Sequence, residues 1–307
     1  MRRAAPLLLA LVLLVGCAVA EAPPAAELPP VVEQRWIPPD KPRAVMLALH
    51  GFNDRKGAFS EFGAYAAAHG ILVEAYDQPG FGARPDRGRW QGLEVLVAEA
   101  HARVRALRLR YPGLPVYVLG ESMGAALVTV AFTEPTAPPV DGVILSAPAV
   151  WGGDALSPLY RRALTIAGLV APWAKLTGGG LGIQASDNIP ALIELGQDPL
   201  YIRETRIDAI VGLVEAMDQA RDRAPLLGIP TLVLTGARDE VVPPQSQAEF
   251  IGFLPAERCA AVTYLDGWHL LLRDLQRERV YADIVAWAES LRLPSGLDRP
   301  CGVAPGA

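Results

Sequence analysis

The segment Gly120-Glu121-Ser122-Met123-Gly124 places a serine between two glycines. It follows an apolar run that ends at Leu119 and precedes a helical pattern that begins near Met123. This strand–turn–helix context is typical of a nucleophile elbow, whose sharp turn requires small residues two positions from the nucleophile. We therefore predict that Ser122 is a nucleophile presented at the turn, with the Met123 backbone N–H facing the same space. The alternative is a chance Gly/Ser turn.

A serine hydroxyl attacks a carbonyl carbon only when a base accepts its proton. The chain has four histidines. His69 lies at a predicted helix end and His101 lies in a charged helical pattern, so neither is well placed. His269 follows the last predicted strand, in a loop, which is where bases of such sites lie. We predict that His269 is the base; the alternative is a packed loop histidine.

The third member of a catalytic triad is a carboxylate that orients the base. Asp239 and Glu240 follow the predicted strand 231–235. Asp239 comes first out of the turn, so we predict that it accepts the Nδ1–H of His269, holds the tautomer and stabilises the imidazolium. The alternative is an aspartate that only closes the turn.

An oxyanion that forms during attack needs two N–H donors aimed at one point. Met123 supplies one of them, and the loop His50-Gly51-Phe52 after the first strong strand supplies the Phe52 N–H. Gly51 lets the chain approach the substrate closely, and we expect His50 to brace this loop beside the substrate. The turn at 77–82 fits structural turn chemistry better than a binding role.

Short apolar runs alternate with helical patterns from about residue 31 onward. The runs are nearly continuous in apolar residues and are bounded by Gly, Pro or Asp, which favours strands buried on both faces of a parallel sheet. Such alternation predicts an α/β fold with a doubly wound, mostly parallel sheet. The predicted strands are 43–50, 71–76, 115–119, 143–146, 231–235 and 261–265, and the predicted helices are about 57–69, 92–110, 123–134, 245–253 and 278–292.

Residues 150–224 interrupt this alternation with helical patterns and no convincing strand. A second helical section is predicted from Asp208 to about Arg221. We interpret the whole stretch as a helical cap inserted between two strands. Its apolar stripe either lines an acyl site or packs on the core; the stripe is Leu159, Ala163, Ile166, Val170 and Trp173.

The N-terminal region has the layout of a secretory signal, with a basic start at Arg2 and Arg3 and an apolar stretch over 7–15. Leu14-Val15-Gly16-Cys17 resembles the lipobox of bacterial lipoproteins, in which the cysteine becomes a lipidated N-terminus. The alternative is an ordinary signal peptide with an incidental cysteine. Residues 18–30 are rich in proline and alanine and favour an extended tether.

Composition excludes several classes of protein. The net charge is −5 with no basic run, which argues against a nucleic-acid binder. The three cysteines fit neither a disulfide scaffold nor a zinc site. If Cys17 is lipidated, Cys259 and Cys301 remain in an exported chain, and we expect them to form a disulfide. The alternative is that Cys259 is a buried free thiol and that Cys301 lies on a loose C-terminal tail.

The motifs together resemble the monoacylglycerol lipase/lysophospholipase branch of the α/β-hydrolases. The resemblance covers about 33–292 and includes the order Ser122, Asp239, His269. Within the cap, Ser186-Asp187 and Asp198-Pro199-Leu200 fall where that branch carries Ser-Asp and Asp-Pro-Leu. Before the serine stands Glu121, where histidine is commoner in these lipases.

The resemblance implies an α/β-hydrolase fold and a serine hydrolase of carboxylic esters, with monoacylglycerols or lysophospholipids as substrates and without a metal or organic cofactor. Alternatives are a small-ester esterase or thioesterase, a peptidase of the same fold, or a non-catalytic lipoprotein that binds a lipid or partner. Cys17 would anchor the exported chain to the bacterial cell envelope. The expected segments are a signal peptide at 1–16, the lipidated cysteine and tether at 17–30, the core at 31–149 and 225–293, the cap at 150–224 and a tail at 294–307.

Overall fold

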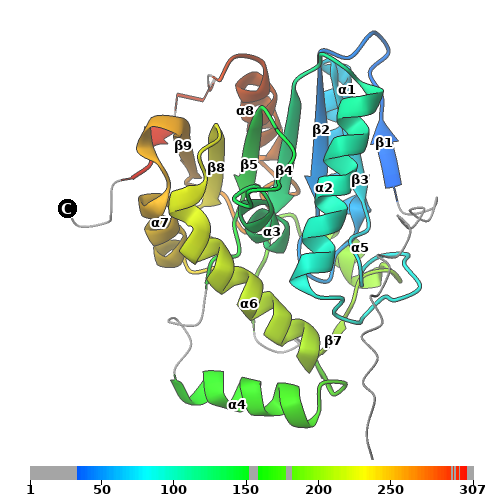
Figure 1. Ribbon diagram of the computed structural model, residues 1–307, viewed down its shortest axis with the longest axis vertical. Coiled ribbons are helices and arrows are strands. Elements are labelled where there is room, and N and C mark those ends of the chain that lie inside the picture. The colour runs from blue at the N-terminus through cyan, green and yellow to red at the C-terminus, as the bar shows by residue number, and fades with distance from the viewer. Residues whose placement is uncertain are drawn as a thin grey trace, which may run out of the picture. The chain divides into compact units, whose positions relative to one another are not determined.

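A computed structural model describes residues 33–151, 158–177, 182–291, 293, 295–296 and 298–302 (Figure 1). The predicted signal peptide at 1–16, the predicted lipidation site Cys17 and the predicted tether up to residue 30 lie outside these residues. Within the described ranges, no helix is both long and apolar enough to cross a bilayer.

An eight-stranded sheet forms the centre of the molecule, in the order β1-β3-β2-β4-β5-β8-β9-β10. In this order, the six strands from β3 to β9 run parallel, and the two edge strands, β1 and β10, run antiparallel to their neighbours. The strands are β1 (Glu33–Trp36), β2 (Ala44–Leu49), β3 (Ile71–Tyr76), β4 (Val116–Glu121), β5 (Gly142–Ser146), β8 (Thr231–Gly236), β9 (Cys259–Tyr264) and β10 (Asp298–Pro300).

The six parallel strands β2, β3, β4, β5, β8 and β9 correspond to the six runs predicted from the sequence. Every residue of β2, β3, β4, β5 and β8 is buried, which explains why these strands read as continuous apolar runs. β1 and β10 were not predicted, because they are short edge strands that carry charged residues.

Helices cover both faces of the sheet. One apolar layer joins the sheet to α2, α3, α6 and α7, and a second joins it to α1 and α8. The sheet is therefore doubly wound, as predicted. The helices of the core are α1 (Ser60–Ala68), α2 (Leu93–Arg110), α3 (Met123–Ala131), α7 (Pro244–Phe253) and α8 (Arg277–Ser290), with the short 3-10 helices η1 (Lys56–Phe59), η2 (Ala224–Leu226) and η3 (Ala256–Arg258).

The cap lies between β5 and β8 in the chain. It contains α4 (Pro158–Val170), α5 (Ile189–Gln197) and α6 (Ile207–Arg223). The prediction that this stretch has no strand is corrected, because β6 (Lys175–Thr177) pairs with β7 (Glu204–Arg206) in a two-stranded ribbon. Each of these strands has three residues, too few to show a periodic pattern.

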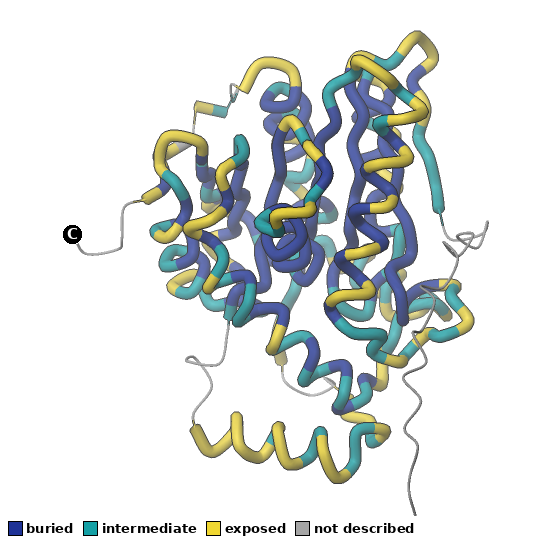
Figure 2. Tube along the Cα trace, in the orientation of Figure 1, coloured by how far each residue is buried: buried dark blue, intermediate teal, exposed yellow. Residues whose placement is uncertain are grey.

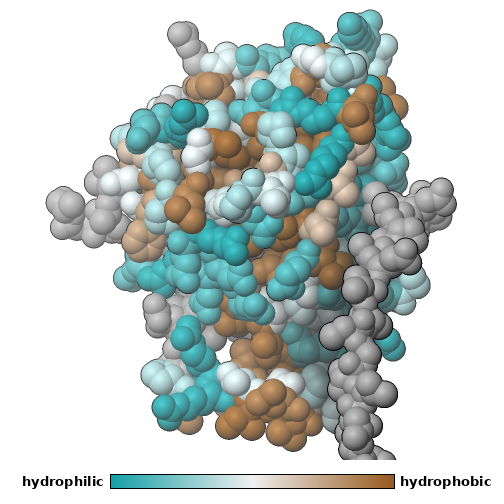
Figure 3. All heavy atoms as spheres, in the orientation of Figure 1, coloured by the Kyte–Doolittle hydropathy of each residue, from teal (hydrophilic) through white to brown (hydrophobic). Residues whose placement is uncertain are grey.

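The helix α4 is the outermost element of the cap. In Figure 1 it lies beyond α6, which contacts both α3 and α4. None of its described residues is buried, and the helix is mostly yellow, that is exposed, in Figure 2. Figure 3 shows a brown, hydrophobic patch at that end of the molecule. Trp173, predicted on the same stripe, lies beyond the end of α4 and is also exposed.

The C-terminal strand β10 is tied to the sheet by a disulfide. Cys259, the first residue of β9, is bonded to Cys301, with 5.5 Å between their Cα atoms. Both cysteines are buried. Of the two alternatives for these cysteines, the structure contains the paired one, and it closes a loop of 41 intervening residues (260 to 300).

Candidate active site

Ser122 lies in the turn between β4 and α3. Its backbone has φ 55° and ψ −116°, a strained left-handed conformation for a residue with a side chain. A Cβ on Gly120 would lie 2.4 Å from the backbone of Gly124, and a Cβ on Gly124 would lie 2.1 Å from the carbonyl oxygen of Leu49. Only glycine fits at either position, so the sequence pattern and the tight turn have one steric cause.

A chain of hydrogen bonds joins the three residues predicted as a triad. The Oγ of Ser122 lies 3.0 Å from Nε2 of His269, and Nδ1 of His269 lies 2.9 Å from Oδ2 of Asp239. With the imidazole neutral and protonated at Nδ1, the serine hydroxyl donates to Nε2 and the imidazole donates to Asp239. His269 lies in the loop after β9, and both it and Asp239 are buried.

The carboxylate of Asp239 is held by further donors. Its Oδ1 accepts the backbone N–H groups of Val241 at 2.8 Å and Val242 at 2.9 Å, and its Oδ2 accepts Nε2 of Gln247 at 2.9 Å. These bonds fix the carboxylate toward His269. The neighbouring Glu240 is directed elsewhere, since its Oε2 accepts the backbone N–H of Gln184 at 2.8 Å.

The loop after β2 lies against the nucleophile. A Cβ on Gly51 would lie 3.3 Å from the Cβ of Ser122, so the backbone approaches closely. Phe52 lines the cavity that contains Ser122. Among the described residues, no hydrogen bond takes up the backbone N–H of Phe52 or of Met123. Both donors are thus available for a ligand atom.

His50 is buried and braces this loop. Its Nδ1 donates to the carbonyl oxygen of Gly51 at 2.8 Å, and its Nε2 accepts the backbone N–H of Gln78 at 3.1 Å. Burial lowers the pKa of His50, which keeps the imidazole neutral. The edge of Phe81 packs against it. The expectation that His50 lines the substrate site is corrected, because both ring nitrogens are bound within the core and it does not line the cavity.

A cavity of about 320 Å³ opens onto Ser122 and His269. Its walls come from the loop after β2, from α5 and α6 of the cap, and from the loops that carry Asp239 and His269. The apolar residues among them are Phe52, Ala149, Trp151, Ala185, Leu195, Leu213, Met217, Val241, Val242 and Leu270.

The cap residues predicted to line the substrate site lie elsewhere. Leu159, Ile166 and Trp173 are 60–76% exposed, and none lines the cavity. The physical reason is the position of α6, which lies between α4 and the core and supplies Leu213 and Met217 to the wall instead. The amphipathic pattern of α4 identified an apolar face but not the partner of that face.

A buried charge cluster lies beside the nucleophile, and the sequence analysis missed it. The guanidinium of Arg273 forms ion pairs with Asp54 and, at 3.1 Å, with Glu121. Burial raises the pKa of Glu121, and the charge of Arg273 opposes that rise. A glutamate at the end of a fully buried strand requires a counterion, and Glu121 was therefore the residue in the sequence that could have predicted this cluster.

A second hydrogen-bond network connects the cap to the loop that carries His269. Ser186 donates to Oδ1 of Asp274 at 2.6 Å, and the backbone N–H of Trp268 donates to Oδ2 at 2.7 Å. The N–H of Leu270 donates to the carbonyl oxygen of Ala185 at 2.9 Å. Trp268, before His269, is therefore linked to Ser186 of the cap through Asp274, and Leu270, after His269, is bound directly to Ala185 of the cap.

Asp274 should make stability depend on pH. Burial raises its pKa from 3.8 to about 6, so the folded chain binds more protons than the unfolded chain between these values. Stability from this group is present below pH 3.8 and is lost as pH rises through about 6. Relative to Asp274→Asn, the wild type should lose on the order of 2 kcal/mol of unfolding free energy between pH 4 and pH 7.

Urea unfolding of both proteins at the two pH values measures this difference. The asparagine also loses the bond from Trp268, but that loss is the same at both pH values. Parallel pH profiles for the two proteins would contradict the assignment.

The described ranges contain no group of three or more His, Cys, Asp or Glu side chains that could hold a metal ion.

The chain is similar in sequence to known hydrolases. Residues 40–276 match the family Hydrolase_4, described as serine aminopeptidase, S33. A monoacylglycerol lipase from Mycolicibacterium smegmatis is 25% identical over 266 residues, which are 85% of this chain and 93% of that protein. A phospholipase from Bacillus subtilis is 25% identical over 249 residues, 79% of this chain and 93% of that protein.

The fold is also shared with solved structures. The crystal structure of the Paleococcus ferrophilus monoacylglycerol lipase superposes with a TM-score of 0.73, at 20% identity, over 85% of this chain and 98% of that one. The sheet order, the inserted cap and the position of Ser122 after β4 are those of an α/β-hydrolase. The chain therefore belongs to the Hydrolase_4 family of serine hydrolases.

Proposed function

We propose that this protein hydrolyses carboxylic esters through an acyl-enzyme on Ser122. The observation that carries the proposal is the continuous chain from Ser122 Oγ through His269 to Asp239. Ser122 attacks the ester carbonyl while its proton passes to Nε2 of His269. Asp239 stabilises the imidazolium, and the backbone N–H groups of Phe52 and Met123 bind the oxyanion.

The second half of the reaction uses the same groups. The tetrahedral intermediate expels the alcohol, which takes the proton from His269, and leaves the acyl group on Ser122. His269 then accepts a proton from water, and the resulting hydroxide attacks the acyl carbonyl. Collapse of this second intermediate returns the proton to Ser122 and releases the carboxylic acid.

The substrates are monoacylglycerols or lysophospholipids, each with one acyl chain. The cavity beside Ser122 is lined mostly by apolar side chains, as an acyl chain requires. Related proteins are named as a monoacylglycerol lipase and a phospholipase, which supports lipid esters over peptides. A small-ester esterase or thioesterase is the second candidate, because a cavity of about 320 Å³ also holds short acyl groups.

A hydrolysis panel separates these candidates. Purified protein is offered 1-acylglycerols, lysophospholipids and acyl thioesters with chains of two to eighteen carbons, together with aminoacyl-peptide substrates. The proposal expects kcat/KM to be highest for an oxygen ester of a medium or long chain. A maximum at acetyl or butyryl esters would favour the esterase, and a maximum on peptides would contradict the proposal.

A fluorophosphonate probe tests whether the site is catalytic at all. The probe phosphonylates a serine only when a base activates it, so labelling of the wild type at Ser122 is expected. An unlabelled but folded protein would instead favour a non-catalytic lipoprotein that binds lipid through its cap.

The exposed apolar face of α4 is proposed to contact the lipid surface that delivers the substrate. Leu159, Leu169 and Val170 of α4 are each at least 69% exposed, and Trp173 follows them. Clustered apolar side chains of this kind mark an interaction site, and an amphipathic helix can lie in a membrane interface.

Leu169→Ala should therefore weaken hydrolysis of lipid presented in vesicles, by about fivefold to tenfold for one leucine no longer buried in lipid. The matched control is Leu109→Ala, because Leu109 is equally exposed but lies near the far end of α2. Activity on a monomeric soluble ester should be equal in both variants. Equal losses on vesicles would contradict the proposed surface.

We also propose that the chain is exported and anchored to the bacterial cell envelope through a lipidated Cys17. The lipobox-like segment 14–17 and the tether that follows it support this proposal. The bond between Cys259 and Cys301 adds an independent argument, because disulfides persist mainly in oxidising compartments.

Cys17→Ser should release the protein from membranes, because a serine cannot take the diacylglycerol. Fractionation of cells that express each form measures the membrane-bound share, with Leu109→Ala, a change at an exposed residue of the folded domain, as the control. An unmodified mature N-terminus on the wild type, seen by mass spectrometry, would contradict the anchor.

A further inference from the structure

The cap segment 184–188, which precedes α5 in the chain, lies against the loop 265–276 that carries His269. We call the first the strap and the second the base loop. Four successive residues of the strap are bonded to residues 270–275 of the base loop. These bonds run from the Leu270 N–H to the Ala185 carbonyl oxygen at 2.9 Å, from Ser186 Oγ to Asp274 at 2.6 Å, from the Leu275 N–H to Asp187 at 2.9 Å, and from Asn188 Nδ2 to the Arg273 carbonyl oxygen at 2.8 Å.

The bond between Ser186 and Asp274 is the buried centre of this contact, since neither side chain is exposed. The Oγ of Ser186 accepts the N–H of Asn188 at 3.1 Å, and its own proton is donated to Oδ1 of Asp274. The other oxygen of Asp274 accepts the N–H of Trp268, the residue before His269, at 2.7 Å. At neutral pH the carboxyl group is above its pKa of about 6, so both bonds are charge-assisted. One carboxylate thus joins the strap to the residue that precedes the base.

The core holds the base loop at points on either side of His269. These are the bond from the Arg238 N–H to the carbonyl oxygen of Gly267 at 2.9 Å, and the bond from the Tyr281 hydroxyl to the carbonyl oxygen of Leu272 at 2.6 Å. Within the described ranges, no hydrogen bond uses the backbone of His269 itself. The residue after it is bonded to the strap and the residue before it to Asp274, so these two contacts set the place of its Cα atom.

The imidazole of His269 has to meet two partners at once. Its Nε2 lies 3.0 Å from Ser122 Oγ, and its Nδ1 lies 2.9 Å from Oδ2 of Asp239. Both partners lie on core loops that follow other strands, so a movement of the base loop alone changes both distances. A displacement of about 1 Å in a catalytic group can lower a rate by roughly 10²-fold. Proton transfer is therefore sensitive to whatever fixes the base loop.

We propose that Ser186 and Asp274 are positioning residues for the base, and that through them the strap fixes the orientation of His269 for proton transfer. Neither residue lines the cavity at Ser122, so both act through His269 and not on the substrate. The inference rests on the ester hydrolysis proposed for Ser122. It gives the cap a part in the chemical step, in addition to the cavity wall and the lipid contact. Loss of the contact should therefore lower kcat much more than it raises KM.

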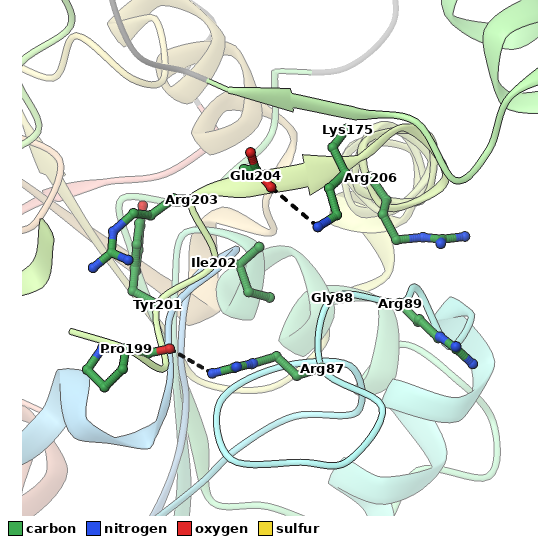
Figure 4. A pocket seen from close by; sticks show the side chains of 10 residues that line it. All are labelled: Arg87, Gly88, Arg89, Lys175, Pro199, Tyr201, Ile202, Arg203, Glu204 and Arg206. Carbon is green, nitrogen blue, oxygen red and sulfur yellow. Dashed lines mark hydrogen bonds and ion pairs between the residues drawn. The ribbon is translucent and has the colours of Figure 1, made fainter. Parts of the chain in front are cut away.

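Ser186→Ala removes the hydroxyl and leaves Asp274 bound to Trp268. On monomeric 1-octanoylglycerol, kcat should fall by roughly 10- to 100-fold, with KM within about threefold, because the base is misplaced while the cavity wall is unchanged. The matched control is Arg87→Gln, which breaks a different bond between cap and core. Arg87 donates to the carbonyl oxygen of Pro199 at 2.7 Å, beyond the other end of α5 (Figure 4). Its kcat should stay within about twofold of the wild type, as for most surface substitutions.

Two further variants of Ser186 isolate the hydroxyl from the space that it fills. Ser186→Thr and Ser186→Val carry side chains of nearly equal volume, and only threonine can donate to Asp274. The steric cost of the larger side chain is common to both, so kcat should be at least about tenfold higher for threonine than for valine. Equal kcat values for the two would overturn the proposal. An equal loss of kcat in Ser186→Ala and Arg87→Gln would also overturn it, because the effect would then come from a loosened cap in general.

Proton NMR gives a readout that lower stability alone would not move. In the wild type, the Nδ1–H that His269 donates to Asp239 should give a resonance far downfield of the amide protons. Well below the unfolding temperature, this resonance should persist in Arg87→Gln and shift upfield or vanish in Ser186→Ala. An unchanged resonance in folded Ser186→Ala protein would overturn the proposal. Failure of the ester hydrolysis itself looks different, because the wild type would then leave the ester intact, while the resonance would still report on the contact between strap and base loop.

Discussion

Ser122→Ala is expected to lower kcat by about 10⁵-fold or more, with little change in stability. Alanine fits the same strained turn and leaves the bond between His269 and Asp239 in place, but no atom remains to form the acyl-enzyme. The oxyanion donors and the cavity persist, so the residual rate should exceed that of uncatalysed hydrolysis.

Steady-state hydrolysis of an octanoyl ester measures the effect, and thermal unfolding confirms that the variant is folded. Fluorophosphonate labelling should disappear in the same preparation. Near-normal turnover by a folded Ser122→Ala protein would place the nucleophile elsewhere and remove the basis of the proposed mechanism.

Asp239→Asn should lower kcat by roughly 10³- to 10⁴-fold. The Oδ2 of Asp239 accepts hydrogen bonds from both His269 and Gln247, so a side-chain NH2 at that position would face two donors. If the amide turns its NH2 to the other side, it meets the N–H groups of Val241 and Val242. Either orientation favours the wrong tautomer of His269 or moves its ring.

Glu240→Gln is the matched control, because it makes the same chemical change one residue away. Glu240 is bound to the backbone of Gln184 at the edge of the cap, so its variant should stay within about threefold of the wild type. A larger loss in Glu240→Gln than in Asp239→Asn would move the acid to Glu240.

The positions of the three triad residues could be predicted because local sequence determines them. Glycines at 120 and 124 are required by backbone contacts under 2.5 Å, so the motif reports directly on the turn. Asp239 and His269 each follow a strand whose buried apolar run is visible in the sequence. The carboxyl ends of parallel strands meet at one edge, which brings the three loops together.

The cap could be predicted only in part. The period of α4 indicated an apolar face, but periodicity does not show which element meets that face, and α6 takes the place beside the core. The ion pairs of Arg273 with Asp54 and Glu121 join residues up to 219 positions apart, so no local pattern contains them.

The two edges of the central sheet have a consequence for how the chain must be produced. An uncovered edge strand presents free N–H and C=O groups that pair readily with other chains and lead to aggregation. At one edge β1 covers β3, and at the other β10 covers β9. The covering strand β10 has only three residues and is held by the bond from Cys301 to Cys259. In a reducing cytosol nothing covalent keeps it in place, so recombinant protein made there should expose β9 and aggregate more readily than protein oxidised during export.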